Sequence, residues 1–210
     1  KVSRREATMK IGIMGGTFDP IHNGHLMLGD TARDQFGLDV IWFMPNGRPP
    51  HKALDSIGSD TDMRAKMVAL AIKDHKSFEL QDYELKRKEV SYSYETLEYF
   101  HAVYPEDEFY FIIGADSLRD IEKWVHPERL LAVCHVLAAY RDGWNTRQTM
   151  LEHISYLNDK YHARIKLLQS PLIAISSHEL RAKIRAGEPI TGLVPAEVEA
   201  FIAKEGLYES

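Results

Sequence analysis

The sequence feature that most constrains the fold is a short apolar run, residues 11–14, that ends at the paired glycines Gly15 and Gly16. Continuous apolar residues are typical of a parallel strand buried on both faces, and glycines after it let the backbone bend and approach a ligand closely. His22 and His25 then stand at the start of a predicted helix. Amide groups at a helix N-terminus favour an anion, and imidazoles at this spacing project from one side of the helix. The sequence therefore predicts a strand, turn and helix that bind a phosphate.

Further apolar runs alternate with helical patterns along the 210 residues of the chain. The runs predicted to be strands are residues 40–44, 78–85, 109–113, 135–140 and 165–168. Such alternation predicts an α/β fold with a doubly wound, mostly parallel sheet and helices on both faces. We expect residues 10–210 to form a single domain, and residues 1–9 to be a disordered tail or an expression remnant.

One predicted helix has methionines in its apolar stripe. Met63, Met67, Leu70 and Ala71 recur at helical spacing, and such a stripe is normally part of the core. This phase places Arg64 and Lys66 on other faces, from which either side chain could reach a phosphate.

Composition excludes several classes of function. A formal net charge of −5 argues against a broad nucleic-acid interface, which needs many basic contacts to phosphates. No apolar run approaches the roughly 18 residues of a transmembrane helix, so we expect a cytoplasmic protein without a membrane partner. Cys134, the only cysteine, lies in an apolar run, which favours a buried structural thiol. The sequence leaves a homo-oligomer open.

The segment at residues 46–61 is rich in proline, glycine and small polar residues, and it contains Arg48, His51 and Lys52. It is longer than an ordinary connection, which favours a functional or a mobile loop. A polyphosphate ligand of an acidic protein needs local positive charge of this kind. A solvated basic loop explains the same residues equally well.

Two other residues have both a structural and a functional interpretation. Asp116 follows the apolar run at residues 109–113, at the strand end where open α/β sheets bind ligands, and it could also cap the next helix. Trp124 is either a platform for a ligand ring or, as for most tryptophans, part of the core.

A capping-box pattern, Ser176 with Glu179, opens a predicted helix near the C-terminus. The amides of that first turn can bind an anion. Arg181 lies close by, and its planar guanidinium suits bidentate binding of a phosphate. The pattern therefore predicts a second phosphate-binding helix start.

The segment GGTFDPIHNGH, residues 15–25, resembles the signature of the nucleotidyltransferase superfamily that has the His-x-Gly-His motif. Over residues 10–208 the chain resembles the bacterial nicotinate mononucleotide adenylyltransferases. The resemblance implies a Rossmann-like fold and transfer of the adenylyl group of ATP to nicotinate mononucleotide, which forms deamido-NAD and pyrophosphate in NAD biosynthesis. It also implies Mg²⁺ as cofactor, held mainly by the triphosphate, with no metal ligands from the protein.

The resemblance further implies roles for residues that match the family's motifs. The implied catalytic residues are His22, His25 and Arg181, with the two histidines on the α- and β-phosphates. The implied ATP-binding residues are Gly15, Gly16, Thr17, Phe18, Gly114, Asp116, Ser176 and Ser177. The residues implied for nicotinate mononucleotide are His51, Lys52, Tyr92, Ser93 and Trp124.

The chain departs from the family pattern at some positions. His178 stands where the family has threonine, which replaces a hydroxyl near the phosphates with an imidazole. In the stretch that holds the nicotinate ring, Val90 replaces a proline and Ser93 a threonine. Three alternative functions stay open: adenylyl transfer to nicotinamide mononucleotide, adenylyl transfer to phosphopantetheine, and ATP sensing without catalysis.

Overall fold

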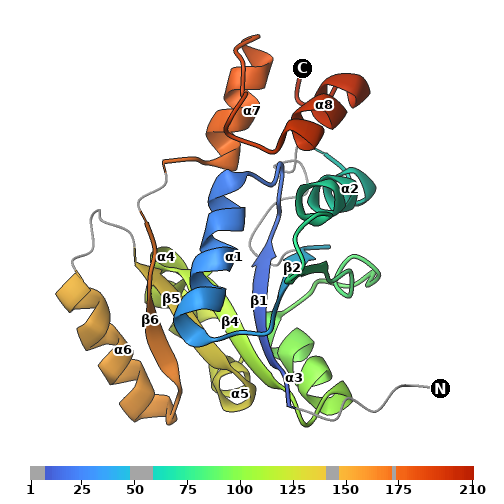
Figure 1. Ribbon diagram of the computed structural model, residues 1–210. Helices are drawn as coiled ribbons and strands as arrows, with labels where there is room; N and C mark the ends of the chain where they lie inside the picture. Colours follow the sequence, from blue (N-terminus) through green and yellow to red (C-terminus); the bar gives the residue numbers. More distant parts are fainter. Residues whose placement is uncertain (1–7, 48–58, 141–146, 172–173) are drawn as a thin grey trace. The chain divides into compact units, whose positions relative to one another are not determined.

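A computed structural model describes residues 8–47, 59–140, 147–171 and 174–210. Within these ranges the chain forms a six-stranded sheet with the strand order β3-β2-β1-β4-β5-β6 (Figure 1). The strands are β1 (Lys10–Gly16), β2 (Val40–Pro45), β3 (Phe78–Leu80), β4 (Glu108–Gly114), β5 (His135–Tyr140) and β6 (Ile165–Gln169). The chain winds outward from β1 to one edge and then from β4 to the other. The predicted doubly wound, Rossmann-like α/β fold is therefore confirmed.

Helices connect these strands along the chain. They are α1 (Asn23–Phe36), α2 (Thr61–Ile72), α3 (Ser93–Val103), α4 (Ala115–Asp120), the 3₁₀ turn η2 (Ile121–Lys123), α5 (Pro127–Val133), α6 (Arg147–Tyr161), α7 (Ser177–Arg185) and α8 (Ala196–Glu205). The strand predicted at residues 78–85 is shorter than expected, because β3 ends at Leu80. No helix in the described ranges is both long enough and apolar enough to cross a membrane.

The chain divides into two compact units, which are described separately. Unit 1 comprises Lys1–Met14, Thr31–Ile41 and Tyr92–Ser170, and unit 2 comprises Gly15–Asp30, Trp42–Ser91 and Pro171–Ser210. The single domain expected over residues 10–210 stays a prediction.

Unit 1 contains three parallel ladders, β1 with β4, β4 with β5 and β5 with β6. The middle residues of β1, β4 and β5 are buried, as the continuous apolar runs predicted, whereas in β6 only Ile165 and Leu168 are buried. A Cβ at Gly12 in β1 would lie 2.6 Å from Cδ1 of Ile41, so a larger residue there would displace that side chain. Cys134 is buried just before β5, and burial raises the pKa of its thiol to about 12. This inert thiol confirms the structural interpretation of the cysteine.

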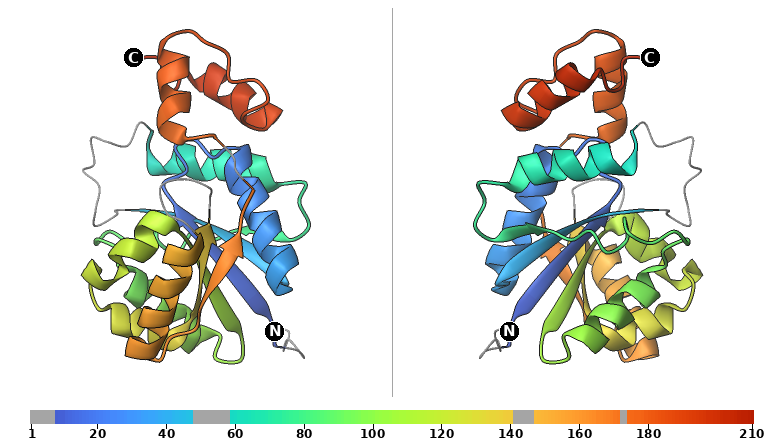
Figure 2. Two further views of the ribbon diagram at one scale, coloured as in Figure 1. Left: turned by 90° about the vertical axis from the view of Figure 1, so that its left-hand side faces the viewer. Right: turned by 90° about the vertical axis from the view of Figure 1, so that its right-hand side faces the viewer.

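Unit 2 contains the contacting helices α2 and α8, which Figures 1 and 2 show beside each other. The two helices are also joined by an ion pair between Lys73 and Glu197 at 2.7 Å. Helix α2 begins after Asp60, whose carboxylate accepts a hydrogen bond from the amide of Met63 at 2.8 Å. The predicted phase of α2 is confirmed at Met67, which is buried, and wrong at Met63, Leu70 and Ala71, which are only half-buried. Its buried residues are Arg64, Met67, Val68 and Ile72, so the guanidinium lies in the core and not on another face.

Candidate active site

The histidine turn, residues 17–25, connects the end of β1 to the first turns of α1 and belongs to unit 2. Phe18 has a φ of 51°, which is uncommon for a residue other than glycine and persists only where the surroundings fix it. Its ring is 2% exposed and packs edge-on against His25, with 4.9 Å between the ring centroids. The ring of Phe18 therefore anchors the turn in the core. Only the backbone of Phe18 could then contact ATP.

Both histidines of the turn use Nδ1 to accept a hydrogen bond from a backbone amide. Nδ1 of His22 accepts from Gly24 N–H at 3.1 Å, and Nδ1 of His25 accepts from His22 N–H at 3.1 Å. An accepting ring nitrogen has no proton, so each neutral imidazole has its proton on Nε2. The rings stack with centroids 3.7 Å apart and planes 24° apart. The turn thus presents two parallel imidazoles, each with an Nε2–H donor in a fixed tautomer.

Side chains from distant parts of unit 2 hold the carbonyl groups of the histidine turn. Arg64 Nη1 donates to Thr17 O at 2.9 Å, Arg181 Nη1 donates to Asp19 O at 2.9 Å, and Ser177 Oγ donates to Pro20 O at 2.8 Å. The structure therefore brings the predicted Arg181 and Ser177 to the predicted histidines. The one hydroxyl proton of Ser177 is donated to Pro20 O. We therefore expect Ser177 to bind a phosphate through its backbone amide. Arg181 has five N–H donors, of which this contact uses one.

The carboxylate of Asp19 is a second point at which the turn is held. Asp19 is 2% exposed, and its Oδ1 accepts from the hydroxyls of Ser59 at 2.6 Å and Tyr208 at 2.5 Å. A buried carboxylate is costly unless hydrogen bonds and charge compensate it. Burial and the bond to Asp19 in turn raise the pKa of the Tyr208 hydroxyl, so Tyr208 is the donor.

Arg64 supplies buried positive charge to this network in unit 2. Its side chain is 1% exposed, and burial lowers the pKa of its guanidinium, while the charge of Asp19 opposes that shift. Within the described residues, Nε of Arg64 is buried and lacks a hydrogen-bond partner. Arg64 therefore remains a buried cation that balances Asp19 rather than a surface arginine available to a ligand.

Sequence reasoning missed Asp19, Ser59 and Tyr208, and it misplaced Arg64. The spacing of Arg64 with Met67 and Val68 fits a helical stripe. A search for buried stripes that accepts an arginine would have identified Arg64. Tyr208 follows the helix-ending Gly206 and has no local pattern that points to Asp19. Contacts between residues so far apart in sequence leave no periodic signal.

The start of α7 has the cap that the sequence predicts. Ser176 Oγ accepts a hydrogen bond from the amide of Glu179 at 3.1 Å. The first-turn amides are thereby fixed beside Ser177, which contacts the histidine turn. His178, at the position where the resemblance implies threonine, is exposed on the same turn.

Unit 1 contains the other predicted ATP contacts, Gly114 and Asp116, where β4 ends and α4 begins. A Cβ at Gly114 would have no atom within 4 Å, so this strand end is open within the described residues. The N-cap of α4 is Gly114, and the suggestion that Asp116 caps the helix is therefore wrong. Asp116 instead lies in the first turn, is 71% exposed and pairs with Arg119 at 3.9 Å.

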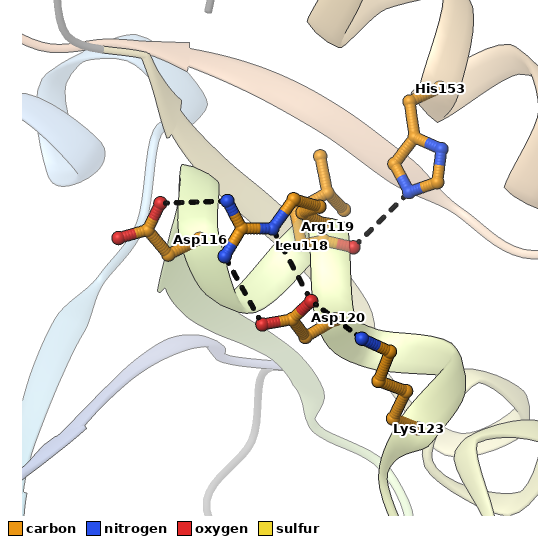
Figure 3. Close-up of polar contacts among 6 residues, drawn as sticks. All are labelled: Asp116, Leu118, Arg119, Asp120, Lys123 and His153. Carbon is orange, nitrogen blue, oxygen red and sulfur yellow. Dashed lines mark hydrogen bonds and ion pairs between the residues drawn. The ribbon is translucent and has the colours of Figure 1, made fainter. Parts of the chain in front are cut away.

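The α4 segment, residues 115–124, ends at Trp124 and is linked by ion pairs. Arg119 also contacts Asp120 at 3.3 Å, and Asp120 contacts Lys123 at 3.6 Å (Figure 3). Trp124 is half-buried and packs edge-on against Phe111, with centroids 6.4 Å apart. It is therefore neither a wholly buried core residue nor a fully exposed one.

The remaining predicted residues for nicotinate mononucleotide are in part described. Tyr92 is the N-cap residue of α3 and Ser93 begins that helix, and both are half-buried in unit 1. His51 and Lys52 lie outside the described residues. Among the described residues no group of three or more His, Cys, Asp or Glu side chains is placed to hold a metal ion.

Comparisons with known proteins identify relatives over nearly the whole chain. The cytidylyltransferase-like family matches residues 13–183. A protein of Desulfitobacterium hafniense named as a probable nicotinate-nucleotide adenylyltransferase is 40% identical over 199 residues, which is 95% of each chain. One of the same name from Lachnoclostridium phytofermentans is 42% identical over 199 residues, 95% of this chain and 98% of that protein.

A solved structure has the same fold. Plasmodium falciparum nicotinic acid mononucleotide adenylyltransferase complexed with NaAD superposes with a TM-score of 0.78 at 23% identity, over 96% of this chain and 98% of that chain. At this level of identity the likeness shows the fold. The two bacterial relatives supply the family relationship.

Proposed function

Because this chain belongs to the cytidylyltransferase-like family, with nicotinate-nucleotide adenylyltransferases as relatives over 95% of its length, we propose that its histidine turn is the site of adenylyl transfer. The reaction joins the adenylyl group of ATP to nicotinate mononucleotide, and it forms deamido-NAD and pyrophosphate in NAD biosynthesis. The single observation that supports this site is the pair of fixed Nε2–H donors on His22 and His25.

In the proposed reaction a phosphate oxygen of the mononucleotide attacks the α-phosphorus of ATP in line. The bond from that phosphorus to the bridging oxygen breaks, and pyrophosphate leaves with the electron pair. No protein nucleophile is needed, so catalysis consists of positioning and of stabilising the charge that develops on the phosphates. Donors on the α- and β-phosphates, as we assign to His22 and His25, act where that charge develops.

The other phosphate contacts are proposed at α7. The guanidinium of Arg181 and the amides near Ser176 would bind the outer phosphates, because the contact to Asp19 holds this arginine beside the histidine turn. Nucleotidyltransferases of this type generally use a divalent metal. We propose that Mg²⁺ arrives as part of the ATP complex, since the carboxylate of Asp19 already accepts two hydroxyl hydrogen bonds.

The acceptor and nucleoside contacts come from the resemblance. We assign Gly114 and Asp116 to the adenosine portion, and Tyr92, Ser93 and Trp124 to the nicotinate ring. His51 and Lys52 remain candidates for the same substrate. A cytoplasmic location and assembly into a homo-oligomer also stay predictions.

The experiment that tests this proposal measures pyrophosphate released from ATP and Mg²⁺ in the presence of one acceptor at a time. The acceptors are nicotinate mononucleotide, nicotinamide mononucleotide and phosphopantetheine. We expect fast release with the first, slow release with the other two, and none when EDTA removes the metal. Release with phosphopantetheine alone would move the activity to a sister enzyme. Silence with every acceptor, together with tight ATP binding, would favour the ATP-sensing alternative.

A further inference from the structure

The residue that holds the histidine turn from the greatest distance in sequence is Tyr208, whose hydroxyl bonds to Asp19. We propose that Tyr208 is a positioning residue for adenylyl transfer. Together with Ser59 it fixes the carboxylate of Asp19, and through that carboxylate it keeps His22 and His25 aimed at the phosphates. This inference rests on the proposed function of the histidine turn.

Tyr208 reaches the histidine turn from the end of α8. Helix α8 ends at Gly206, which has a φ of 61°, and the amide of Leu207 donates back to Ile202 O at 3.1 Å. Tyr208 follows with a φ of 65° and is 6% exposed. A tyrosine in the left-handed region is strained, and it persists where the surroundings fix it. In this structure the left-handed conformation of Tyr208 is held by the hydrogen bond from its hydroxyl to Asp19.

The hydroxyls of Ser59 and Tyr208 act together on the carboxylate of Asp19. They donate to the same oxygen, Oδ1, and they lie 3.3 Å from each other. Three oxygen atoms in mutual contact fix the direction of the carboxylate more tightly than one bond does. Arg64, in the same unit, contributes the compensating charge and holds the neighbouring carbonyl of Thr17.

The backbone of Asp19 connects this carboxylate to the catalytic groups. Asp19 precedes Pro20 directly, and its own carbonyl accepts from Arg181, which we assign to the phosphates. His22 lies two residues beyond Pro20 and donates its amide to His25. If the Asp19 side chain loses its anchors, the backbone at Asp19 can move, and Arg181 and both imidazoles would shift with it. Misplacement of catalytic groups by about 1 Å can lower a rate by roughly 100-fold.

The test is Tyr208→Phe, which removes the hydroxyl and keeps the ring. We expect kcat to fall about 10-fold while the KM for ATP changes less than about threefold, because substrate contacts remain and alignment is lost. The matched control is Tyr99→Phe on the exposed face of α3, which should retain full kcat. All assays are made well below the measured Tm of each variant.

Ser59→Ala, alone and combined with Tyr208→Phe, tests whether the two hydroxyls act through the same carboxylate. If both hydroxyls act through Asp19, the loss of kcat in the double variant will be smaller than the product of the two single losses. An unchanged kcat in folded Tyr208→Phe, or a rise in KM alone, would overturn the proposal. So would a multiplicative loss in the double variant. An inactive wild-type protein would instead refute the proposed function.

Discussion

The histidine turn and the α4 segment both follow a glycine at the end of a buried parallel strand, but they are held in opposite ways. The histidine turn is fixed by buried and part-buried hydrogen bonds to Arg64, Ser177, Arg181 and Tyr208, all distant in sequence. The α4 segment is linked by ion pairs between side chains close in sequence and largely exposed.

This difference indicates where each unit needs fixed geometry. Groups that stabilise charge in a transition state must be held in place before the reaction, since movement at that moment costs rate. Buried polar bonds with satisfied partners achieve this, whereas exposed ion pairs contribute little and are screened by salt. We therefore expect substitutions in the two regions to differ in size, and the following variants test that expectation in order of decreasing effect.

Arg64→Met should have the largest effect. It removes the buried cation that balances Asp19 and the hydrogen bond that this guanidinium donates to Thr17 O. We expect the free energy of unfolding to fall by about 3 kcal/mol, because the buried carboxylate of Asp19 loses compensating charge. Urea unfolding measures this loss.

The control for that variant is Lys66→Met, which lies on the exposed face of the same helix. It makes the same kind of change without a buried partner, so the free energy of unfolding should stay within about 0.5 kcal/mol of the wild type. Equal losses in the two variants would contradict a special role for the buried guanidinium.

His25→Ala should give the next largest effect. It removes one Nε2–H donor and the ring that accepts the amide of His22. Loss of a preorganised donor typically costs about 100-fold in kcat, and we expect that loss here with little change in Tm. Turnover in saturating ATP and nicotinate mononucleotide measures it. His101→Ala, on α3, is the control, and near-normal turnover of His25→Ala would remove His25 from the mechanism.

The sequence predicted the elements of the fold well because each depends on local or periodic information. The paired glycines predicted the end of β1, and Ser176 with Glu179 predicted the start of α7. The apolar run at residues 135–140 coincides with β5. Strand ends and helix caps are decided by neighbours in sequence, so the pattern is visible before folding.

The support of the histidine turn could not be predicted in the same way. Tyr208 and Asp19 meet over 189 positions of sequence, and neither residue belongs to a periodic pattern that requires the other. Arg64 was assigned to the wrong face because a charged residue in an apolar stripe contradicts ordinary burial preferences. Which polar residues meet in the core depends on how whole helices and strands pack together. A single sequence does not specify that packing.

Trp124→Ala tests the functional part of the α4 segment. If the half-buried ring stacks on the nicotinate ring, as we propose, its loss removes a stacking contact of about 1–3 kcal/mol. The KM for nicotinate mononucleotide should then rise about 10-fold or more, while the KM for ATP stays near its wild-type value. Val125→Ala, at the exposed neighbouring position, is the control. An equal rise in both KM values would place the tryptophan in the support of the fold.

Arg119→Ala should have the smallest effect, although Arg119 pairs with both Asp116 and Asp120 in Figure 3. Its partners Asp116 and Asp120 are solvated, so water replaces the lost contacts, and their attraction is already screened at physiological salt. Tm and kcat should both stay close to the wild-type values, and the difference should shrink further as salt is raised. A loss of kcat that approaches that of His25→Ala would show that Asp116 depends on this arginine, and would reverse the contrast between the two regions.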